Sequence, residues 1–471
     1  MSEVWSEFEG NGTCGTKFGI GRWKLMMQAL GTVEVIPAAR RLISSLRDMG
    51  YEFPTAVADL VDNSIEAGAT VVTVDVEFEG EDSWVRISDN GAGMSSATLR
   101  EALRYGSSRK YSSTDLGKFG LGLKVASLSQ CQRLSVASRT GRERSELAAY
   151  CWDLAHIERT NRWELVSPSR SSSQSLYAPL EDSSGTVVLW QRLDRILGYD
   201  RPDGESARRR LIGMCRDVEA HLAVVFHRFL SGEVRGRPKL RLLLNGTDIV
   251  PWDPFARDEP ATKRLDPVNI PVMHSGRRGD LVLEPFVLPH QSGFSSPESF
   301  RRASGPANWN QQQGFYVYRA NRLIQSGGWC RIRTSDEHTK LARVALHFAP
   351  RMDDAFRVNV SKMRVQLPSS IRASLAEAIA PVTKVANEAY RGIRGANGAS
   401  AIGRQSIHGS SKNRPNRNSV NGWNPAALAE RLTVSQVVAH LLSVARADEQ
   451  KIIRRVAGRL RKGLPQRRRM R

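Results

Sequence analysis

The sequence predicts a multi-domain protein of the α/β (α+β) class. At 471 residues the chain is long enough for two or three domains with sizeable cores, and its hydrophobic content of 40% is normal for a globular protein. Helical and strand patterns alternate along most of the chain, as expected when helices pack on a mixed sheet. Three motifs that contain acidic residues, glycines or both fall within residues 56–127. We therefore expect the functional site of the first domain in this stretch.

The first motif lies on a predicted helix over residues 55–67. Gly68 ends this helix, as glycine commonly does just past a helix C-terminus. Asp59 and Asn63 are four residues apart, so they share one face. An amide oxygen there can bind Mg²⁺, and a carboxylate can orient or deprotonate a water that attacks a phosphate. A solvated polar face is the alternative interpretation of this helix taken alone.

The second motif is a loop that follows two predicted strands, residues 71–78 and 84–88. Its two glycines, Gly91 and Gly93, permit positive φ and a close approach of the backbone to a ligand. Asp89, at the end of the second strand, could accept a hydrogen bond from the exocyclic amine of adenine. An ordinary Asp-Asn-Gly turn between a strand and a helix is the alternative.

The third motif places Gly117, Gly120 and Gly122 just before a predicted helix over residues 123–128. Backbone N–H groups at a glycine-rich helix N-terminus can bind phosphate, and Lys118 and Lys124 add positive charge. The chain contains no Gly-x-x-x-x-Gly-Lys-[Ser/Thr], which excludes a Walker A loop. No predicted strand feeds the glycines directly, which argues against a dinucleotide-binding fingerprint.

In this order, the three motifs resemble the signature of the gyrase, heat-shock chaperone, histidine-kinase and mismatch-repair ATPases (the GHKL superfamily) over about residues 35–190. The resemblance implies a Bergerat-type ATP-binding sandwich with ATP and Mg²⁺ as cofactors. It makes Asn63 the Mg²⁺ ligand and Asp89 the adenine contact. It also implies a base-pocket wall at Gly93 and Met94, beside Gly91. An ATP lid over residues 105–119 includes Gly106, Lys118 and Phe119. The phosphate cradle consists of Gly120, Leu121, Gly122 and Lys124.

One residue departs from the family pattern. GHKL members that hydrolyse ATP usually carry glutamate where this chain has Asp59, whose side chain is one methylene shorter. The resemblance therefore implies an ATPase that turns over slowly, with Asp59 as its base. A histidine kinase would need a phosphoacceptor histidine ahead of the ATP site. No histidine occurs before His156, which argues against that class.

The remaining elements extend the α/β pattern into a second region. In the first region we expect helices at 37–49 and 99–105 and strands at 133–139, 146–152 and 163–166. In the second we expect strands at 185–191, 239–244, 281–287, 341–348 and 356–360, a strand pair at 314–324, helices at 206–230 and 369–391, and a polar loop at 291–313.

The second region resembles the ribosomal-S5-like transducer domain of gyrase, mismatch-repair and MORC proteins. Residues 314–324 look like the corresponding stretch of MORC ATPases and related prokaryotic proteins, which makes this chain MORC-like. That domain normally supplies one lysine to the γ-phosphate. By its order along the chain this is Lys362, a second catalytic residue beside Asp59, with Arg364 as the fallback. An exposed lysine after a strand is the alternative.

The basic charge is concentrated at the end of the chain. Residues 401–471 contain 16 Lys and Arg against 3 Asp and Glu, so they carry +13 of the net charge of +21. Residues 392–421 are rich in Gly, Ser, Asn and Arg, a composition typical of a disordered linker. We expect a polyanion partner, with DNA first, RNA second and an anionic membrane third, bound through phosphates without sequence preference. A solvated tail is the alternative.

Cysteine usage and hydropathy bear on location. The five cysteines are scattered without metal-ligand spacing, which is typical of free thiols in a reducing cytosol. No run approaches 18 apolar residues, and the N-terminus has neither a basic nor an apolar signal segment. We therefore expect a cytoplasmic protein that makes no use of a membrane.

Together these patterns predict five parts and one function. The parts are an N-terminal extension or dimer strap at 1–34, the GHKL domain at 35–184, the transducer at 185–391, a basic linker at 392–423 and a basic helical arm at 424–471. The predicted function is an ATP-dependent homodimer that clamps or remodels DNA in genome defence or DNA repair. A nuclease or helicase partner protein would supply any cutting or unwinding. A chaperone-like ATPase and a non-hydrolysing ATP sensor are the alternatives.

Overall fold

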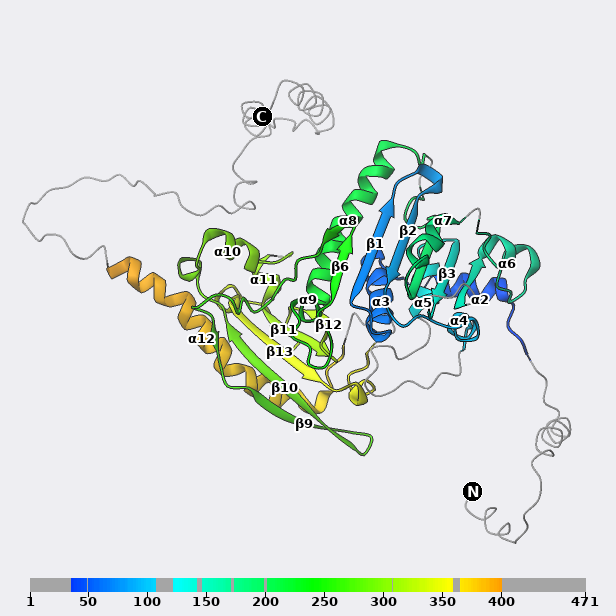
Figure 1. Cartoon of the computed structure of the whole chain (residues 1–471). Helices are drawn as coiled ribbons and strands as arrows, with labels where there is room; N and C mark the ends of the chain where they lie inside the picture. Colours follow the sequence, from blue (N-terminus) through cyan, green and yellow to red (C-terminus); the bar gives the residue numbers. More distant parts are fainter. Residues whose placement is uncertain are drawn as a thin grey trace, which may run out of the picture. The chain divides into compact units, whose positions relative to one another are not determined.

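The structure is a computed structural model of the chain. It describes residues 35–48, 50–106, 122–141, 146–170, 173–198, 201–306, 308–358 and 365–399, all within one unit of the chain, residues 1–402. Several predictions lie outside the described residues: the N-terminal extension, most of the lid, the basic linker and arm, and the site residues Lys118, Phe119, Gly120, Leu121 and Lys362. The described part holds two β-sheets with helices packed on them (Figure 1).

The first sheet has seven strands in the order β4-β3-β5-β2-β1-β6-β7. Neighbouring strands are antiparallel except β1 and β6, which run parallel. The strands are β1 (Val71–Glu77), β2 (Trp84–Asp89), β3 (Arg133–Arg139), β4 (Leu147–Asp153), β5 (Gly185–Gln191), β6 (Arg241–Leu244) and β7 (Thr247–Asp248).

Helices pack on this sheet because its central strands alternate two apolar sets. On β5, Val188 and Trp190 belong to the main core, whereas Val187 and Leu189 belong to a small separate core. The main core is shared by α2 (Ala39–Arg47), α3 (Phe53–Glu66), α4 (Ser96–Leu103), α5 (Gly122–Leu128), α6 (Leu154–Thr160), α8 (Glu205–Val225) and α9 (His227–Ser231). The small core is closed by α7 (Gln174–Tyr177) and the 3₁₀ turn η3 (Ala178–Leu180).

The second sheet has six strands, in the order β12-β11-β13-β10-β8 with β9 paired to β10. Its strands are β8 (Lys263–Arg264), β9 (Val268–His274), β10 (Arg277–Val287), β11 (Gly314–Arg319), β12 (Arg322–Ser326) and β13 (Ala342–Phe348). Phe315 and Val317 of β11 pack in one core with the long helix α12 (Arg372–Ala399), whereas Tyr316 and Tyr318 join the main core of the first sheet. Strand β11 is therefore buried on both faces, as expected for a strand whose first five residues, 314–318, carry no charge.

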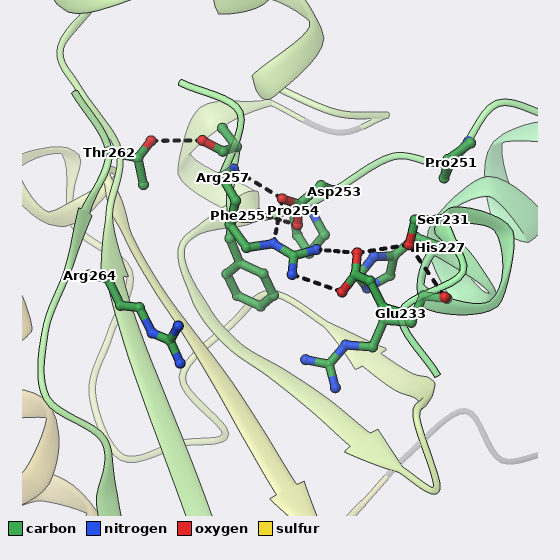
Figure 2. A network of polar contacts seen from close by, with 12 residues as sticks. His227, Ser231, Glu233, Pro251, Asp253, Pro254, Phe255, Arg257, Thr262 and Arg264 are labelled. Atoms are coloured by element: carbon green, nitrogen blue, oxygen red, sulfur yellow. Dashed lines mark hydrogen bonds and ion pairs between the residues drawn. The ribbon is translucent and has the colours of Figure 1, made fainter. Parts of the chain in front are cut away.

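A charged network fixes the connection from α9 to the second sheet (Figure 2). Arg257 donates to the two carboxylate oxygens of Glu233 at 2.7 and 2.8 Å, and its Nε donates to Asp253 at 2.8 Å. Burial raises the pKa of Glu233, but the hydrogen bonds from Arg257 outweigh it and hold that pKa below its usual value. The planar guanidinium binds both acids at once, which defines the path of this segment.

Several predicted elements differ in the structure. In place of a strand at 163–166, the chain makes one bridge, between Val166 and Cys151. The predicted loop 291–313 contains α10 (Pro297–Ala303) and α11 (Trp309–Gln312), because Ser296 and Asn308 cap their first turns. The predicted helix 206–230 is broken at Phe226 into α8 and α9. Of the strand predicted at 356–360, Phe356 and Arg357 form a turn and residues 359–360 lie outside the described residues. Strand β9 was not predicted.

Sheet membership also differs from the expected division of the chain. Residues 185–191 and 239–244 were placed in the second region from their position in the sequence. In the structure β5 lies between β3 and β2, and β6 pairs with β1, so both belong to the first sheet. Order along the chain does not reveal which sheet a strand joins, because pairing depends on contacts between distant segments.

Among the helices that the structure describes, none is both long and apolar enough to cross a membrane.

Candidate functional site

Helix α3 presents the acidic residues of the first motif. The predicted helix is confirmed: it runs from Phe53 to Glu66, and Gly68 follows its end with a φ of +76°. Asp59 and Asp62 are buried, with 2% and 0% of their surface exposed, whereas Asn63 is exposed. The shared face predicted for Asp59 and Asn63 thus has a buried carboxylate at one end and an accessible amide one turn further on.

The two oxygens of Asp59 have different surroundings. The hydroxyl of Tyr51 donates to Oδ2 at 2.9 Å, and Nη2 of Arg322 lies 3.7 Å from Oδ1. Burial raises the pKa of Tyr51, and the charge of Asp59 raises it further, so the phenol stays protonated and donates. A Cβ added at Gly122 would lie 3.5 Å from Oδ2. The first and third motifs therefore meet at this oxygen, across the α3–α5 contact.

Asp89 ends β2 beside α3. Its Oδ1 accepts hydrogen bonds from the N–H of Gly91 at 2.9 Å and of Thr186 at 3.2 Å, and its Oδ2 accepts from the Ser64 hydroxyl at 2.8 Å. Burial raises the pKa of Asp89 although these three hydrogen bonds lower it. A carboxylate oxygen can accept two hydrogen bonds, so Oδ2, which accepts only from Ser64 among the described residues, has room for a further donor.

The loop after Asp89 lies against the far end of β3. The backbone N–H of Met94 donates to the Ser138 hydroxyl at 2.8 Å, and that hydroxyl donates to the carbonyl of Gly185 at 2.9 Å. Gly93 has a φ of +69°, and a Cβ there would lie 2.0 Å from the carbonyl oxygen of Arg139. Only glycine fits this position, because both the backbone conformation and the space exclude a side chain.

Replacing Gly93 by alanine is expected to lower the free energy of unfolding by about 2–3 kcal/mol, since strained φ and overpacking act together. Urea unfolding of both proteins measures the difference. Gly246→Ala is the matched control: Gly246 has a φ of +79°, but a Cβ there meets nothing within 4 Å. Equal losses in the two variants would show that the contact with Arg139 is unimportant and that only the φ matters.

Residues of all three motifs meet at α3, since Gly122 lies beside Asp59 and Asp89 accepts a hydrogen bond from Ser64. Residues 51–186 match the family described as histidine kinase-, DNA gyrase B- and HSP90-like ATPases. These residues therefore form a domain of the GHKL superfamily. The predicted resemblance to that superfamily and the mixed α/β fold are therefore confirmed.

Relatives of the GHKL domain include proteins named DNA mismatch repair protein MutL. The Salmonella arizonae protein is 38% identical over 244 residues, which are 50% of this chain and 35% of that protein. The Shewanella frigidimarina protein is 38% identical over 101 residues, which are 20% of this chain and 16% of that protein. The chain thus spans about a third or less of the length of these relatives. The particular closeness to MORC ATPases stays a prediction.

Lys124 of the GHKL domain points into the protein. Only 1% of it is exposed, its Nζ donates to the carbonyl of Ala102 at 2.8 Å, and Nζ lies 5.7 Å from the centre of the Tyr105 ring. Burial lowers its pKa to about 8, although Glu101 raises it. In this arrangement Lys124 joins α5 to the C-terminal end of α4. Its predicted contact with phosphate stays a prediction.

The residues present fit Mg²⁺ held mainly by a nucleotide. The described residues contain no group of three or more His, Cys, Asp or Glu side chains that could hold a metal ion. Mg²⁺ keeps several waters and is often bound by one protein oxygen together with substrate phosphates, so a single exposed amide such as that of Asn63 suffices. Of the predicted lid, the structure describes only Tyr105 and Gly106. Gly106 has a φ of +74°, and a Cβ added there would meet nothing within 4 Å.

Sequence reasoning missed five residues that shape this site: Tyr51, Ser64, Ser138, Thr186 and Arg322. The pair Gly185-Thr186 at the start of an apolar strand was a usable signal, because a glycine there permits close approach of two backbones. Arg322 was also visible as a charged residue at the start of an apolar strand. Nothing in the sequence near Arg322 indicated its partner, since Asp62 lies 260 residues away.

Proposed function

We propose that the chain binds Mg-ATP on the face of α3 that meets α5 and hydrolyses it slowly, using Asp59 as the base. ATP binding would gate homodimerisation, and the dimer would clamp or remodel DNA. Genome defence or DNA repair in the cytoplasm is the proposed setting. Lys362 would reach the γ-phosphate from the second region, and a nuclease or helicase would act beside the clamp.

The observation that carries this proposal is the meeting of Asp59 with Gly122. The Cβ position of Gly122 lies 3.5 Å from Oδ2 of Asp59, so the glycine leaves open the space beside the carboxylate. The backbone N–H groups before a helix can bind phosphate, and a carboxylate at that place can orient the attacking water. Asn63 would hold Mg²⁺ one turn along α3, and Oδ2 of Asp89 would accept a hydrogen bond from the adenine amine.

The burial of Asp59 favours slow turnover and keeps a second function open. Asp59 is 2% exposed and already accepts a hydrogen bond from Tyr51. Water must therefore reach an oxygen that the protein partly covers, and the shorter aspartate reaches less far than glutamate. A non-hydrolysing ATP sensor is the second candidate, supported by the same burial.

The proposed DNA partner rests on charge and on the names of the relatives. The matched relatives are called DNA mismatch repair proteins, and the net charge of +21 suits a polyanion. Contacts between Lys or Arg and phosphates make binding depend steeply on salt. The basic C-terminal arm, residues 424–471, is the proposed contact.

The test is ATP turnover by the full chain with and without double-stranded DNA, at several salt concentrations. We expect DNA to raise turnover. Neutralising Arg467, Arg468 and Arg469 to Gln should lower the slope of log affinity against log salt by about 2–3, as expected for three lost phosphate contacts. The matched control neutralises Arg208, Arg209 and Arg210, three exposed arginines of α8. ATP turnover that does not change when DNA is added would contradict the proposed role of the arm. Equal changes of the salt slope in the two triple variants would contradict it too.

A further inference from the structure

Arg322 reaches from the second sheet to the acidic residues of α3. It is the first residue of β12, and 2% of it is exposed. Its Nε donates to Oδ1 of Asp62 at 2.8 Å, and its Nη2 lies 3.7 Å from Oδ1 of Asp59. The hydrogen bond to Asp62 anchors the guanidinium. Its weaker contact with Asp59 orients the Asp59 carboxylate.

The turn before Arg322 is tightly defined. β11 and β12 are joined by Ala320 and Asn321, whose φ values are +48° and +67°. Two central residues with positive φ make a type I′ turn, whose twist matches that of a hairpin. An alanine with positive φ is strained, and such conformations persist only where the surroundings fix them. The turn therefore gives Arg322 little freedom relative to its sheet.

Arg319, the last residue of β11 before the turn, is also fixed by an ion pair. Arg319 donates from Nε and Nη2 to the two oxygens of Asp353 at 2.7 and 2.8 Å, and both residues are buried. Asp353 follows the short helix η6 (Pro350–Met352) and precedes Lys362 in the sequence. One hairpin thus contacts α3 through Arg322 and, through Arg319, the segment after β13, which precedes the predicted γ-phosphate lysine in the sequence.

The charges around Arg322 are not explained by stability alone. Two carboxylates share one guanidinium, whose positive charge also acts on the phenol of Tyr51 and on the imidazole of His221. Burial lowers the pKa of His221 to about 4, and Arg322 lowers it as well, so the imidazole is neutral near pH 7. Burying charged groups costs desolvation, and well-packed apolar residues are often as stable. A role in placing Asp59 accounts for the arrangement better.

We propose that Arg322 is a positioning residue for ATP hydrolysis: anchored on Asp62, it holds Oδ1 of Asp59 so that Oδ2 faces Gly122. The role rests on the hydrolysis proposed above. Since β12 belongs to the second sheet, a shift of that sheet relative to α3 would turn the Asp59 carboxylate. Arg322 would then make hydrolysis depend on the position of the second sheet.

The experiment compares kcat, ATP affinity and thermal unfolding of the full chain in matched variants. Arg322→Gln combined with Asp62→Asn removes the guanidinium without leaving Asp62 charged and unpaired. We expect kcat to fall by about 10–100-fold with ATP affinity within about 3-fold, since misplacing a catalytic group is costly. Arg322→Lys should restore part of the loss.

The control removes a charge pair that is not part of the proposed site. Arg86→Gln with Asp75→Asn breaks a 2.7 Å ion pair between β2 and β1 and should leave kcat unchanged. A kcat within about 3-fold of wild type in the Arg322 double variant would overturn the positioning role. Joint loss of ATP binding and thermal stability would overturn it too, because the role would then be structural. Absence of turnover in the wild-type protein would instead overturn the proposed hydrolysis, and the positioning role with it.

Discussion

Replacing Asp59 by asparagine should reduce ATP turnover by about 100-fold or more, because a positioned base contributes at least that factor. ATP affinity should change little, since asparagine keeps the size of the side chain and Asp62 still neutralises Arg322 at 2.8 Å. The measurement is steady-state phosphate release beside equilibrium binding of ATP. Turnover that survives the substitution would show that Asp59 is not the base.

Asp59→Glu is the comparison variant for Asp59→Asn, because it keeps the carboxylate. Glutamate restores the family's usual residue, and the open Cβ position at Gly122, 3.5 Å from Oδ2, gives the longer side chain a direction in which to extend. We expect turnover at or above that of the wild-type protein. Loss of turnover in both variants, with ATP still bound, would favour the non-hydrolysing sensor.

Replacing Asp89 by asparagine should weaken ATP binding by about 100-fold, as expected when a charge-assisted acceptor becomes a donor that faces the adenine amine. The internal hydrogen bonds can persist. The asparagine oxygen can take the place of Oδ1 and accept from Gly91 and Thr186, while its amide faces the Ser64 hydroxyl, which can accept. Thermal unfolding should therefore change little, and calorimetry or a fluorescent nucleotide measures the affinity.

The purine itself supplies the control for Asp89. Guanine presents an oxygen where adenine presents an amine, so the variant amide should lose less affinity for GTP than for ATP. The ratio of the two affinities is insensitive to general damage. Equal losses for both nucleotides would mean that Asp89 supports the loop through Ser64 and Thr186 but does not read the base.

Local patterns were enough for the elements that carry the site. The helix with Asp59 and Asn63, the two strands before Asp89 and the hairpin at 314–324 are each defined by their own periodicity and by the glycines or turn residues at their ends. Short polar segments were harder. The helices α10 and α11 are seven and four residues long, too short for a helical period to stand out from a loop.

The sequence by itself determined the superfamily, the order of the motifs and the residue types at the site, because these depend on neighbours along the chain. Only the tertiary structure decided that β5 joins the first sheet, that Lys124 turns toward Ala102 and that Arg322 reaches Asp62 across 260 residues. Such contacts depend on which surfaces meet when the sheets pack, and a single sequence carries no local mark of them. The pair of Arg322 with Asp62 shows the consequence: each residue looked ordinary alone, and their meeting defines the surroundings of Asp59.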